Sequence, residues 1–470
     1  MDYDIAEFAL KEVLKNDAEY AEVRLEETKT NGFIMKNGIS QISGFDRSRG
    51  VCVKFLINKT SGFLSTNKLD KNKIKQLIRH AIKTTKRASD IGEKVIYSPE
   101  KSSRESYSVK QKIKLQDFGS EKKLGLLRDV DNSITNSKVN VIGRYFSILD
   151  FETEKLYLNS EGSRVLAKIP KTNFTYFLTI KSREIMQHYW QYGYAGGFET
   201  ILNKNFPSLI KKEVKILDTV SKKGVKAPRG NVDLVLGPQI TGIMVHESVG
   251  HPYEADRILG REAAQAGESF VKKNMLNTRI GSSCVNVIDD PTLKNGYGFY
   301  LYDDEGIKAR QRRLIQNGII NEFLHNRETS SSMGIKSNGS ARAMSYENEA
   351  IVRMANTYMV PGDYKENELF SGIKKGVYIR SFMEWNIDDI RFNQKYVGAE
   401  AYLIKNGKIG SPVIRPVLEI TTPKLYGSID AVANNLEFHA GNCGKGEPMQ
   451  SAPVWMGGPS IRLRNVSLGK

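Results

Sequence analysis

Two histidines five positions apart impose the strongest constraint on how this chain folds. The segment VHESVGHPYEAD contains His246, Glu247 and His251. On a regular α-helix, residues at i and i+4 lie about 40° apart around the axis, whereas residues at i and i+5 lie about 140° apart. Both imidazoles can therefore face one ligand only where the helix departs from regular geometry.

The residues around this segment predict where the helix lies and how it is distorted. Residues 231–236 are apolar enough for a buried strand, the Gly-Pro pair at 237–238 breaks that strand, and a helix is expected from Gln239. A π-bulge widens one helical turn and would bring the two imidazoles onto one face. Gly250 permits such a distortion, and Pro252 would then end the helix.

Histidine, glutamate and histidine in this order are typical of a catalytic zinc site. Two neutral imidazoles bind the ion, and the neighbouring carboxylate accepts a proton from the bound water. Zinc polarises a peptide carbonyl and lowers the pKa of its bound water toward about 7. The sequence thus predicts a zinc-dependent peptidase, with His246 and His251 as ligands and Glu247 as the general base. The alternative is a helix that carries two purely structural histidines.

A catalytic zinc usually takes three protein ligands and one water, so another part of the chain must supply the third ligand. The candidates are Glu254, Asp256, His439 and Cys443. The segment HAGNCGKGEP (439–448) is rich in glycine, which predicts a loop that could fold a side chain back onto the ion. Because a thiolate binds zinc well, Cys443 is the preferred third ligand and His439 comes second.

The chain carries an excess of positive charge. Its 470 residues include 70 Lys and Arg against 53 Asp and Glu, so the net charge is 70 − 53 = +17. A basic surface favours anionic partners such as nucleic acid. However, the densest basic stretch, Lys71 to Arg87, has apolar residues at helical spacing, which predicts an amphipathic helix with its lysines in water. Nucleic acid is therefore disfavoured as a partner.

The ends and cysteines of the chain bear on its location. No apolar run approaches the roughly 18 residues that span a bilayer, so no membrane segment is expected. The first residues read MDYDIAEF, which is acidic where a signal peptide is basic, so a cytoplasmic location is expected. The three cysteines, Cys52, Cys284 and Cys443, are odd in number and far apart, which argues against a disulfide framework.

Patterns along the chain predict an α+β protein in three parts. Residues 1–98 show helix, strand and helix patterns and form an expected N-terminal α/β domain. After a polar connection at 99–114, residues 115–205 form a central mixed α/β segment. A basic loop at 221–230 then precedes a β-rich catalytic domain at 231–470, which carries the HExxxH helix.

Local patterns also predict turns and one aromatic strand. Asn-Gly pairs at 37–38, 317–318 and 406–407 lie between apolar segments, which predicts β-hairpins with type I′ turns. Alternate positions of residues 188–194 hold one histidine and three aromatic residues, which would share one face of a strand. Such a row can stack on bases, but core or interface packing is the more common role.

Five segments resemble the TldD/PmbA family of metalloproteases, and specifically its TldD type. They are GPQITGIMVHESVGHPYEAD, YDDEG (302–306), NGSARA (338–343), YVGAEAYLIKNGK (396–408) and GNCGKGEP (441–448). Their order and combination are more specific than HExxxH alone. PmbA-type members are similar in fold but lack the metal motif, which this chain retains.

The resemblance implies a ligand set, a substrate class and an assembly. The family's zinc is held by both histidines of HExxxH and by the cysteine of the GxCGKG loop, which correspond here to His246, His251 and Cys443, with Glu247 as the catalytic carboxylate. Members form homodimers, or heterodimers with a PmbA-type subunit, around a chamber that admits unfolded peptides. Activities in the family include trimming a modified peptide precursor and degrading peptides or an unfolded antitoxin.

Two polar segments leave more than one interpretation open. Asp303, Asp304 and Glu305 form an acidic turn to which no role is assigned. Arg342 of the NGSARA segment could hold a peptide backbone or a carboxylate, since arginine can donate two parallel hydrogen bonds to one carboxylate. A structural role for Arg342 has equal weight.

Two other functions compete with the peptidase. A nucleic-acid-binding or gyrase-modulating protein would use the net charge and the aromatic row, but no nucleic-acid-binding module is recognisable. A non-catalytic assembly subunit, as PmbA-type proteins are, would not need the intact HExxxH motif. The zinc peptidase therefore remains the preferred prediction.

Overall fold

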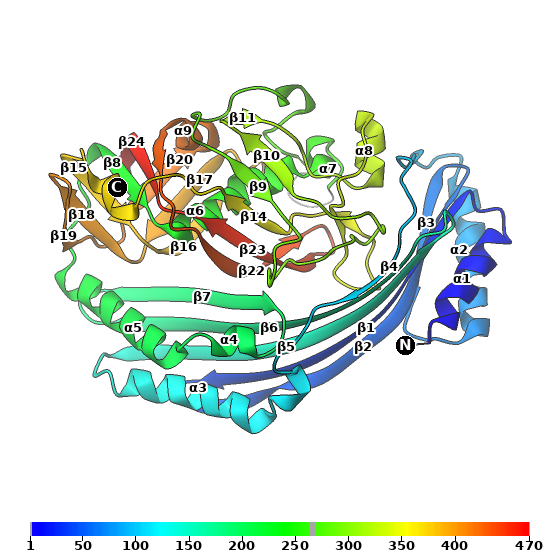
Figure 1. Ribbon diagram of the computed structural model, residues 1–470, viewed down its shortest axis with the longest axis horizontal. Helices are drawn as coiled ribbons and strands as arrows, with labels where there is room; N and C mark the ends of the chain where they lie inside the picture. Colours follow the sequence, from blue (N-terminus) through cyan, green and yellow to red (C-terminus); the bar gives the residue numbers. More distant parts are fainter. Residues whose placement is uncertain (1, 263–267, 470) are drawn as a thin grey trace.

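The protein combines long curved strands with a β-rich second half (Figure 1). The computed structural model describes residues 2–262 and 268–469. Helices and strands alternate in the first half, and strands dominate the second, which confirms the predicted α+β class. Within the described ranges, no helix combines the length and the apolar character needed to cross a bilayer.

The first half contains one large sheet with helices packed against it. Its strands are β1 (Tyr20–Lys36), β2 (Ile39–Ile57), β3 (Thr60–Thr66), β4 (Arg104–Ser108), β5 (Val141–Asn159), β6 (Arg164–Lys181) and β7 (Ile185–Ala195). Its helices are α1 (Asp4–Leu14), α2 (Lys71–Ala88), α3 (Ser120–Thr135), α4 (Glu199–Leu202) and α5 (Phe206–Lys223), with a short 3₁₀ turn at Leu115–Asp117.

This sheet joins the two segments that the sequence predicts as separate parts. The strand order is β3-β2-β1-β5-β6-β4, and β7 also pairs with β6. β1 and β5 are antiparallel from the pair Glu22 and Asn159 to the pair Lys36 and Tyr145. Residues 1–98 and 115–205 therefore contribute strands to a single sheet.

The prediction of an irregular polar connection at 99–114 is wrong for the middle of this segment, where β4 pairs in parallel with β6. Four of the five β4 residues are exposed and none is buried. A strand at a sheet edge with both faces largely in water shows no alternation of apolar and polar residues, so the pattern gives no signal for it.

Helices cover one face and one end of the large sheet. In Figure 1, the long strands curve beneath the second half of the chain, while α3 and α5 lie on the opposite face. The core between this face and the two helices includes Phe146, Phe174 and Leu178. At the far end, α1 and α2 pack on the sheet, and α2 buries Ile74, Ile78 and Ile82 while its lysines remain outside, as predicted.

In the residues that the structure describes, the second half forms two large sheets and one two-stranded pair. The strands are β8 (Gly230–Leu236), β9 (Val287–Asp289), β10 (Arg312–Gln316), β11 (Ile319–Ile320), β12 (Ala341–Arg342), β13 (Ile351–Val352), β14 (Asn356–Met359), β15 (Lys375–Ile379), β16 (Phe382–Ile387), β17 (Asn393–Gly398), β18 (Ala401–Lys405), β19 (Lys408–Pro412), β20 (Val417–Thr421), β21 (Ile429–Val432), β22 (Glu437–Lys445), β23 (Gln450–Gly458) and β24 (Ile461–Leu468). The α-helices are α6 (Pro238–Val245), α7 (Ala255–Ile258), α8 (Arg327–Met333) and α9 (Thr422–Gly427), and short 3₁₀ turns lie at Lys273–Met275 and Glu366–Phe370.

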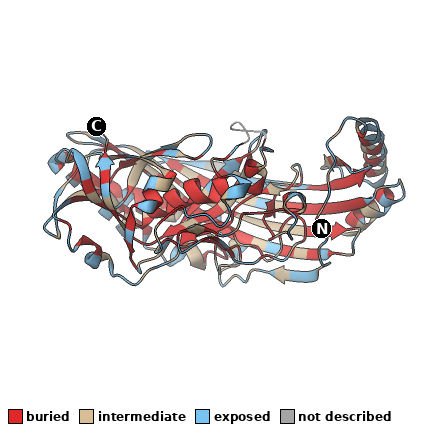
Figure 2. Ribbon diagram, turned by 90° about the horizontal axis from the view of Figure 1, so that it is seen from above, coloured by how far each residue is buried: buried red, intermediate tan, exposed pale blue. Residues whose placement is uncertain are grey.

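One sheet has the order β16-β17-β20-β24-β8-β15-β18-β19, with β21 beside β24, and the other has the order β11-β10-β9-β14-β23-β22. β12 and β13 form a separate pair. Both large sheets contribute side chains to one core that also contains α6. In Figure 2, buried residues run continuously through this half of the molecule.

The three predicted hairpins are confirmed. The Asn-Gly pairs at 37–38, 317–318 and 406–407 connect β1 to β2, β10 to β11 and β18 to β19. Each residue of the three pairs has a positive φ, as a type I′ turn requires. The aromatic row of residues 188–194 lies on β7, where His188 and Trp190 are buried in the protein and leave little surface for stacking on bases.

Gly458 sets the distance between α6 and β23. A Cβ atom at this position would lie 2.4 Å from Thr241 Cγ2 and 3.2 Å from the Thr241 backbone carbon. We expect Gly458→Ala to lower the free energy of unfolding by about 1–3 kcal/mol, because the helix must move away from the strand. Chemical denaturation would measure the loss. Gly427→Ala is the control, since its Cβ would meet no atom within 4 Å, and an equal loss in both variants would contradict the packing argument.

Candidate metal centre

The predicted distortion of the HExxxH helix is present. β8 leads into α6, which ends at Val245, and residues His246–Gly250 then form a π-helical turn. A 3₁₀ turn at His251–Tyr253 follows, and the backbone becomes extended at Glu254, just beyond Pro252. The wider turn brings the rings of His246 and His251 to a centroid distance of 5.0 Å at an angle of 81°. The two imidazoles therefore face one region of space despite their spacing of five.

Gly250 lets the widened turn pack closely against Met354, which lies more than 100 residues later in the sequence. A Cβ atom at this position would lie 2.5 Å from Met354 Sδ and 2.9 Å from Met354 Cε. Met354 is itself fully buried, so it has little room to move away. The glycine of the motif thus serves close packing as well as backbone freedom.

Cys443 approaches the two histidines from a distant part of the sequence. Its Sγ lies 3.2 Å from His251 Nε2. One ligand atom from each of His246, His251 and Cys443 lies within 4.8 Å of the other two, and all three residues are buried. Three side chains with the donor atoms that zinc prefers therefore meet at one point.

The prediction of a loop at 439–448 is wrong for most of this segment, because Glu437–Lys445 form the edge strand β22, which carries Cys443. The glycines of this strand lie where other side chains come close to its backbone, which is a common reason for glycine inside a strand. A Cβ atom at Gly441 would lie 2.9 Å from Met456 Cε, and one at Gly444 would lie 2.8 Å from Met449 Sδ.

The other candidate ligands lie outside this cluster of donor atoms. Glu254 Oε2 is 3.1 Å from His251 Nδ1, on the side of the ring away from Cys443. Asp256 accepts hydrogen bonds of 2.6 and 2.8 Å from Lys445 Nζ. His439 packs edge-on against Trp190, with ring centroids 4.4 Å apart. Glu254 therefore orients a ring, as residues behind metal-binding histidines commonly do.

Burial and neighbouring charges set the protonation of these groups. Burial lowers the pKa of both His246 and His251, which favours the neutral imidazoles that can bind a metal. Burial alone would raise the pKa of the Cys443 thiol, but His251 and Arg353 outweigh it and lower that pKa. Burial would also raise the pKa of the Glu254 carboxyl, but Lys445 and His251 hold that pKa well below its ordinary value.

Glu247 has a partner that the sequence did not predict. Arg391 Nη1 donates a hydrogen bond of 2.9 Å to Glu247 Oε2, and both side chains are buried. Arg391 lies in the turn between β16 and β17, where its φ is 66°. A single arginine in a turn more than 100 positions from the motif carries no pattern that could identify it.

A pocket of about 550 Å³ opens beside the histidines and the glutamate. Its wall combines three parts of the chain: the HExxxH turn, the residues Ala440 to Gly444 of β22, and strand β16 with the turn that follows it, which carry Trp385 and Arg391. Trp190 of β7 closes it from the large sheet. The site thus lies where the two halves of the protein meet.

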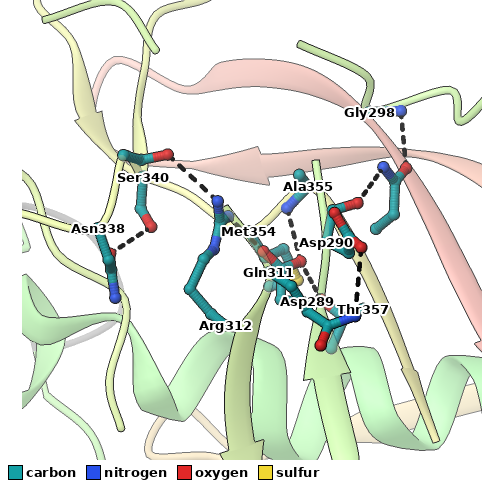
Figure 3. A network of polar contacts seen from close by, with 12 residues as sticks. Asp289, Asp290, Gly298, Gln311, Arg312, Asn338, Ser340, Met354, Ala355 and Thr357 are labelled. Atoms are coloured by element: carbon teal, nitrogen blue, oxygen red, sulfur yellow. Dashed lines mark hydrogen bonds and ion pairs between the residues drawn. The ribbon is translucent and has the colours of Figure 1, made fainter. Parts of the chain in front are cut away.

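A polar network holds the segment behind the site (Figure 3). Asp289 Oδ1 accepts hydrogen bonds from the Ala355 N–H and the Thr357 hydroxyl, each 2.8 Å long. Its other oxygen pairs with Arg312, and neither side chain of this ion pair is exposed. The network fixes the residues that lead into β14, among them Met354, which a Cβ atom at Gly250 would meet.

Comparison with known proteins identifies the family. The model of the PmbA/TldA metallopeptidase C-terminal domain matches residues 229–470, and that of domain 1 matches residues 21–85. A metalloprotease of Methanocaldococcus jannaschii is 31% identical over 454 residues, covering 96% of this chain and 97% of the relative. A protein of Saccharolobus solfataricus named zinc metalloprotease TldD homolog is 27% identical over 470 residues, covering 98% of each.

The fold is shared with a solved structure as well. TldE from Thermococcus kodakarensis matches with a TM-score of 0.74 at 15% identity, covering 99% of this chain and 100% of that one. The family models, the full-length relatives and the common fold agree with the motifs found in the sequence. The chain belongs to the TldD/PmbA family of metallopeptidases.

Proposed function

We propose that this protein is a zinc-dependent peptidase in which His246, His251 and Cys443 hold the ion and Glu247 is the general base. The observation that carries the proposal is the meeting of three buried zinc-type donors beside a carboxylate in one pocket. The name of the Saccharolobus solfataricus relative supports zinc as the metal.

The residues present suit a zinc ion. Two imidazoles and one thiolate, with room for a water, form a known type of catalytic zinc site. His246 Nδ1 is buried and has no hydrogen-bond partner among the described residues, so the ring is not committed to another protein group. When bound, zinc would polarise the peptide carbonyl and acidify a water molecule.

Glu247 would carry the proton during hydrolysis. Its carboxylate lines the same pocket as the three donors, within reach of a water bound there. It would accept a proton from the attacking water and pass it to the leaving amine. Arg391 holds one carboxylate oxygen and so orients the base, since a bond to an arginine restricts the rotation of the side chain.

A peptide would bind in an extended form along β22. In the described part of the chain, β22 pairs with β23 on one side and with no strand on the other. Gly441, Asn442 and Gly444 of this strand line the pocket, so an added peptide strand would pass the metal-binding residues. Backbone hydrogen bonds would supply affinity, which suits unfolded peptides of varied sequence.

Other parts of the assignment stay predictions. They are the natural peptide, the dimer chamber, the choice between a second copy and a PmbA-type subunit, and the cytoplasmic location. A purely non-catalytic subunit would not need the three donors to meet beside Glu247, so the geometry favours the catalytic alternative.

Replacing Cys443 by alanine tests the ligand set. We expect the purified wild-type chain to contain one zinc per polypeptide and the Cys443→Ala variant to lose most of it, because one of three protein ligands is removed. Metal analysis by mass spectrometry gives the stoichiometry. His439→Ala is the matched control from the same strand. Full zinc in Cys443→Ala together with loss in the His439 variant would reassign the third ligand.

Replacing Glu247 by glutamine separates catalysis from metal binding. We expect hydrolysis of an unstructured peptide to fall about 100-fold or more while zinc content is unchanged, because the amide cannot accept the proton. Peptide cleavage followed by mass spectrometry measures the rate. Glu419→Gln, an exposed carboxylate on β20, is the control. Normal cleavage by the Glu247 variant would refute its role as the base.

A further inference from the structure

A second pocket lies between the large sheet and the second half of the chain. Its volume is about 140 Å³. Strands β5 and β6 form its floor, and the segments at 299–304 and 341–344 form its opposite wall. Much of the lining is apolar or aromatic and includes Phe151, Ile169, Phe299 and Tyr300. Met344, which is 47% exposed, lines the same pocket and marks its connection to solvent.

The two aspartates of the acidic turn that line this pocket, Asp303 and Asp304, already have partners. Asp304 Oδ1 lies 2.5 Å from Lys155 Nζ, which is also 3.7 Å from Glu26. Asp303 accepts hydrogen bonds from three backbone N–H groups, those of Glu305, Ile307 and Ala341. The acidic turn therefore serves the structure of the protein and neutralises Lys155.

Lys171 remains without an anionic partner. Lys171 is 7% exposed and lines the pocket from β6, and its ammonium makes no hydrogen bond or ion pair within the described part of the chain. Its ammonium lies 5.6 Å from the ring centre of Tyr297 and 6.0 Å from that of Phe151. Burial lowers the pKa of Lys171 well below its ordinary value, and the neighbouring Arg342 lowers it further.

Arg342 is the second cation without a carboxylate. Its two terminal nitrogens donate to the carbonyls of Met354 at 2.7 Å and Pro453 at 2.8 Å, so it holds the protein's own backbone. Its guanidinium also lies 5.6 Å from the ring centre of Tyr300. These contacts satisfy hydrogen bonds but leave the positive charge unneutralised at the pocket wall.

We propose that this pocket binds a carboxylate carried on a small apolar group, with Lys171 as its ion-pair partner. Burial disfavours the ammonium form of a lysine without a partner, and a bound carboxylate would stabilise that form as an ion pair. The volume is close to the roughly 150 Å³ of an apolar cavity that accepts benzene, so the space suits a branched or aromatic body of that size. The site is separate from the metal-binding residues and does not depend on the proposed peptidase activity.

Such a carboxylate can come from a free short-chain acid or from the C-terminal residue of a peptide. Isothermal calorimetry on the purified full chain would compare three probes at millimolar concentration: isobutyrate, an acetylated tripeptide ending in valine, and the same tripeptide with an amidated end. Binding of isobutyrate or of the free-acid peptide is expected, and the probe that binds identifies the source. No binding of either acid, or equal binding of the amidated peptide, would overturn the proposal.

The Lys171→Met variant tests the ion pair. It removes the charge but keeps most of the volume, and we expect the acid that binds to do so at least about tenfold more weakly, as the loss of a charge-assisted hydrogen bond implies. Lys168→Met is the control, because Lys168 lies on the same strand but pairs with Glu152 and is half exposed. With thermal unfolding midpoints unchanged, undiminished affinity in Lys171→Met would show that the pocket does not bind the acid through this residue.

Discussion

The widened turn between His246 and His251 is the constraint on which the whole site depends. A regular helix would direct the two rings away from each other. The π-helical turn at His246–Gly250 removes that conflict, and the packing of Gly250 on Met354 gives the turn a fixed support. α6, which leads into this turn, is buried on all sides in the core to which both sheets of the second half contribute. The rigid surroundings therefore hold a backbone geometry that an isolated helix would not keep.

The segment from Met354 to Thr357 connects this turn to the rest of the protein. Asp289 binds its backbone and the Thr357 hydroxyl, and the Asp289–Arg312 pair is wholly buried. Removing one partner of a buried ion pair commonly costs about 3–5 kcal/mol, because the other charge is left buried and unpaired, so this segment needs both partners. The carbonyl of Met354 also accepts a bond from Arg342. The π-helical turn and the second pocket thus rest on the same short segment.

Much of the site could be predicted because its signals are local. The spacing of the histidines, the glycine between them and the proline after them together predicted the irregular turn, and the chemistry of a lone thiol in a glycine-rich segment favoured Cys443. The hairpins followed from Asn-Gly pairs that need positive φ at both residues.

What the sequence did not predict depends on contacts between distant parts of the chain. Arg391 reaches Glu247 only because β16 and β17 place their turn beside α6. β4 lies at a sheet edge with four of its five residues exposed, and β22 contains glycines where other side chains come close. Neither strand shows the alternation by which strands are recognised. The pairing of β1 with β5, which joins the first two predicted parts, is likewise a long-range contact.

X-ray absorption at the zinc edge of the purified protein tests the central claim most directly. If His246, His251 and Cys443 hold the ion, the spectrum will require one sulfur at about 2.3 Å and nitrogen or oxygen neighbours at about 2.0–2.1 Å, with the multiple scattering of imidazole rings. A zinc environment without sulfur, or with a single imidazole, would contradict the account, because it would mean that the turn does not bring these three side chains to one ion.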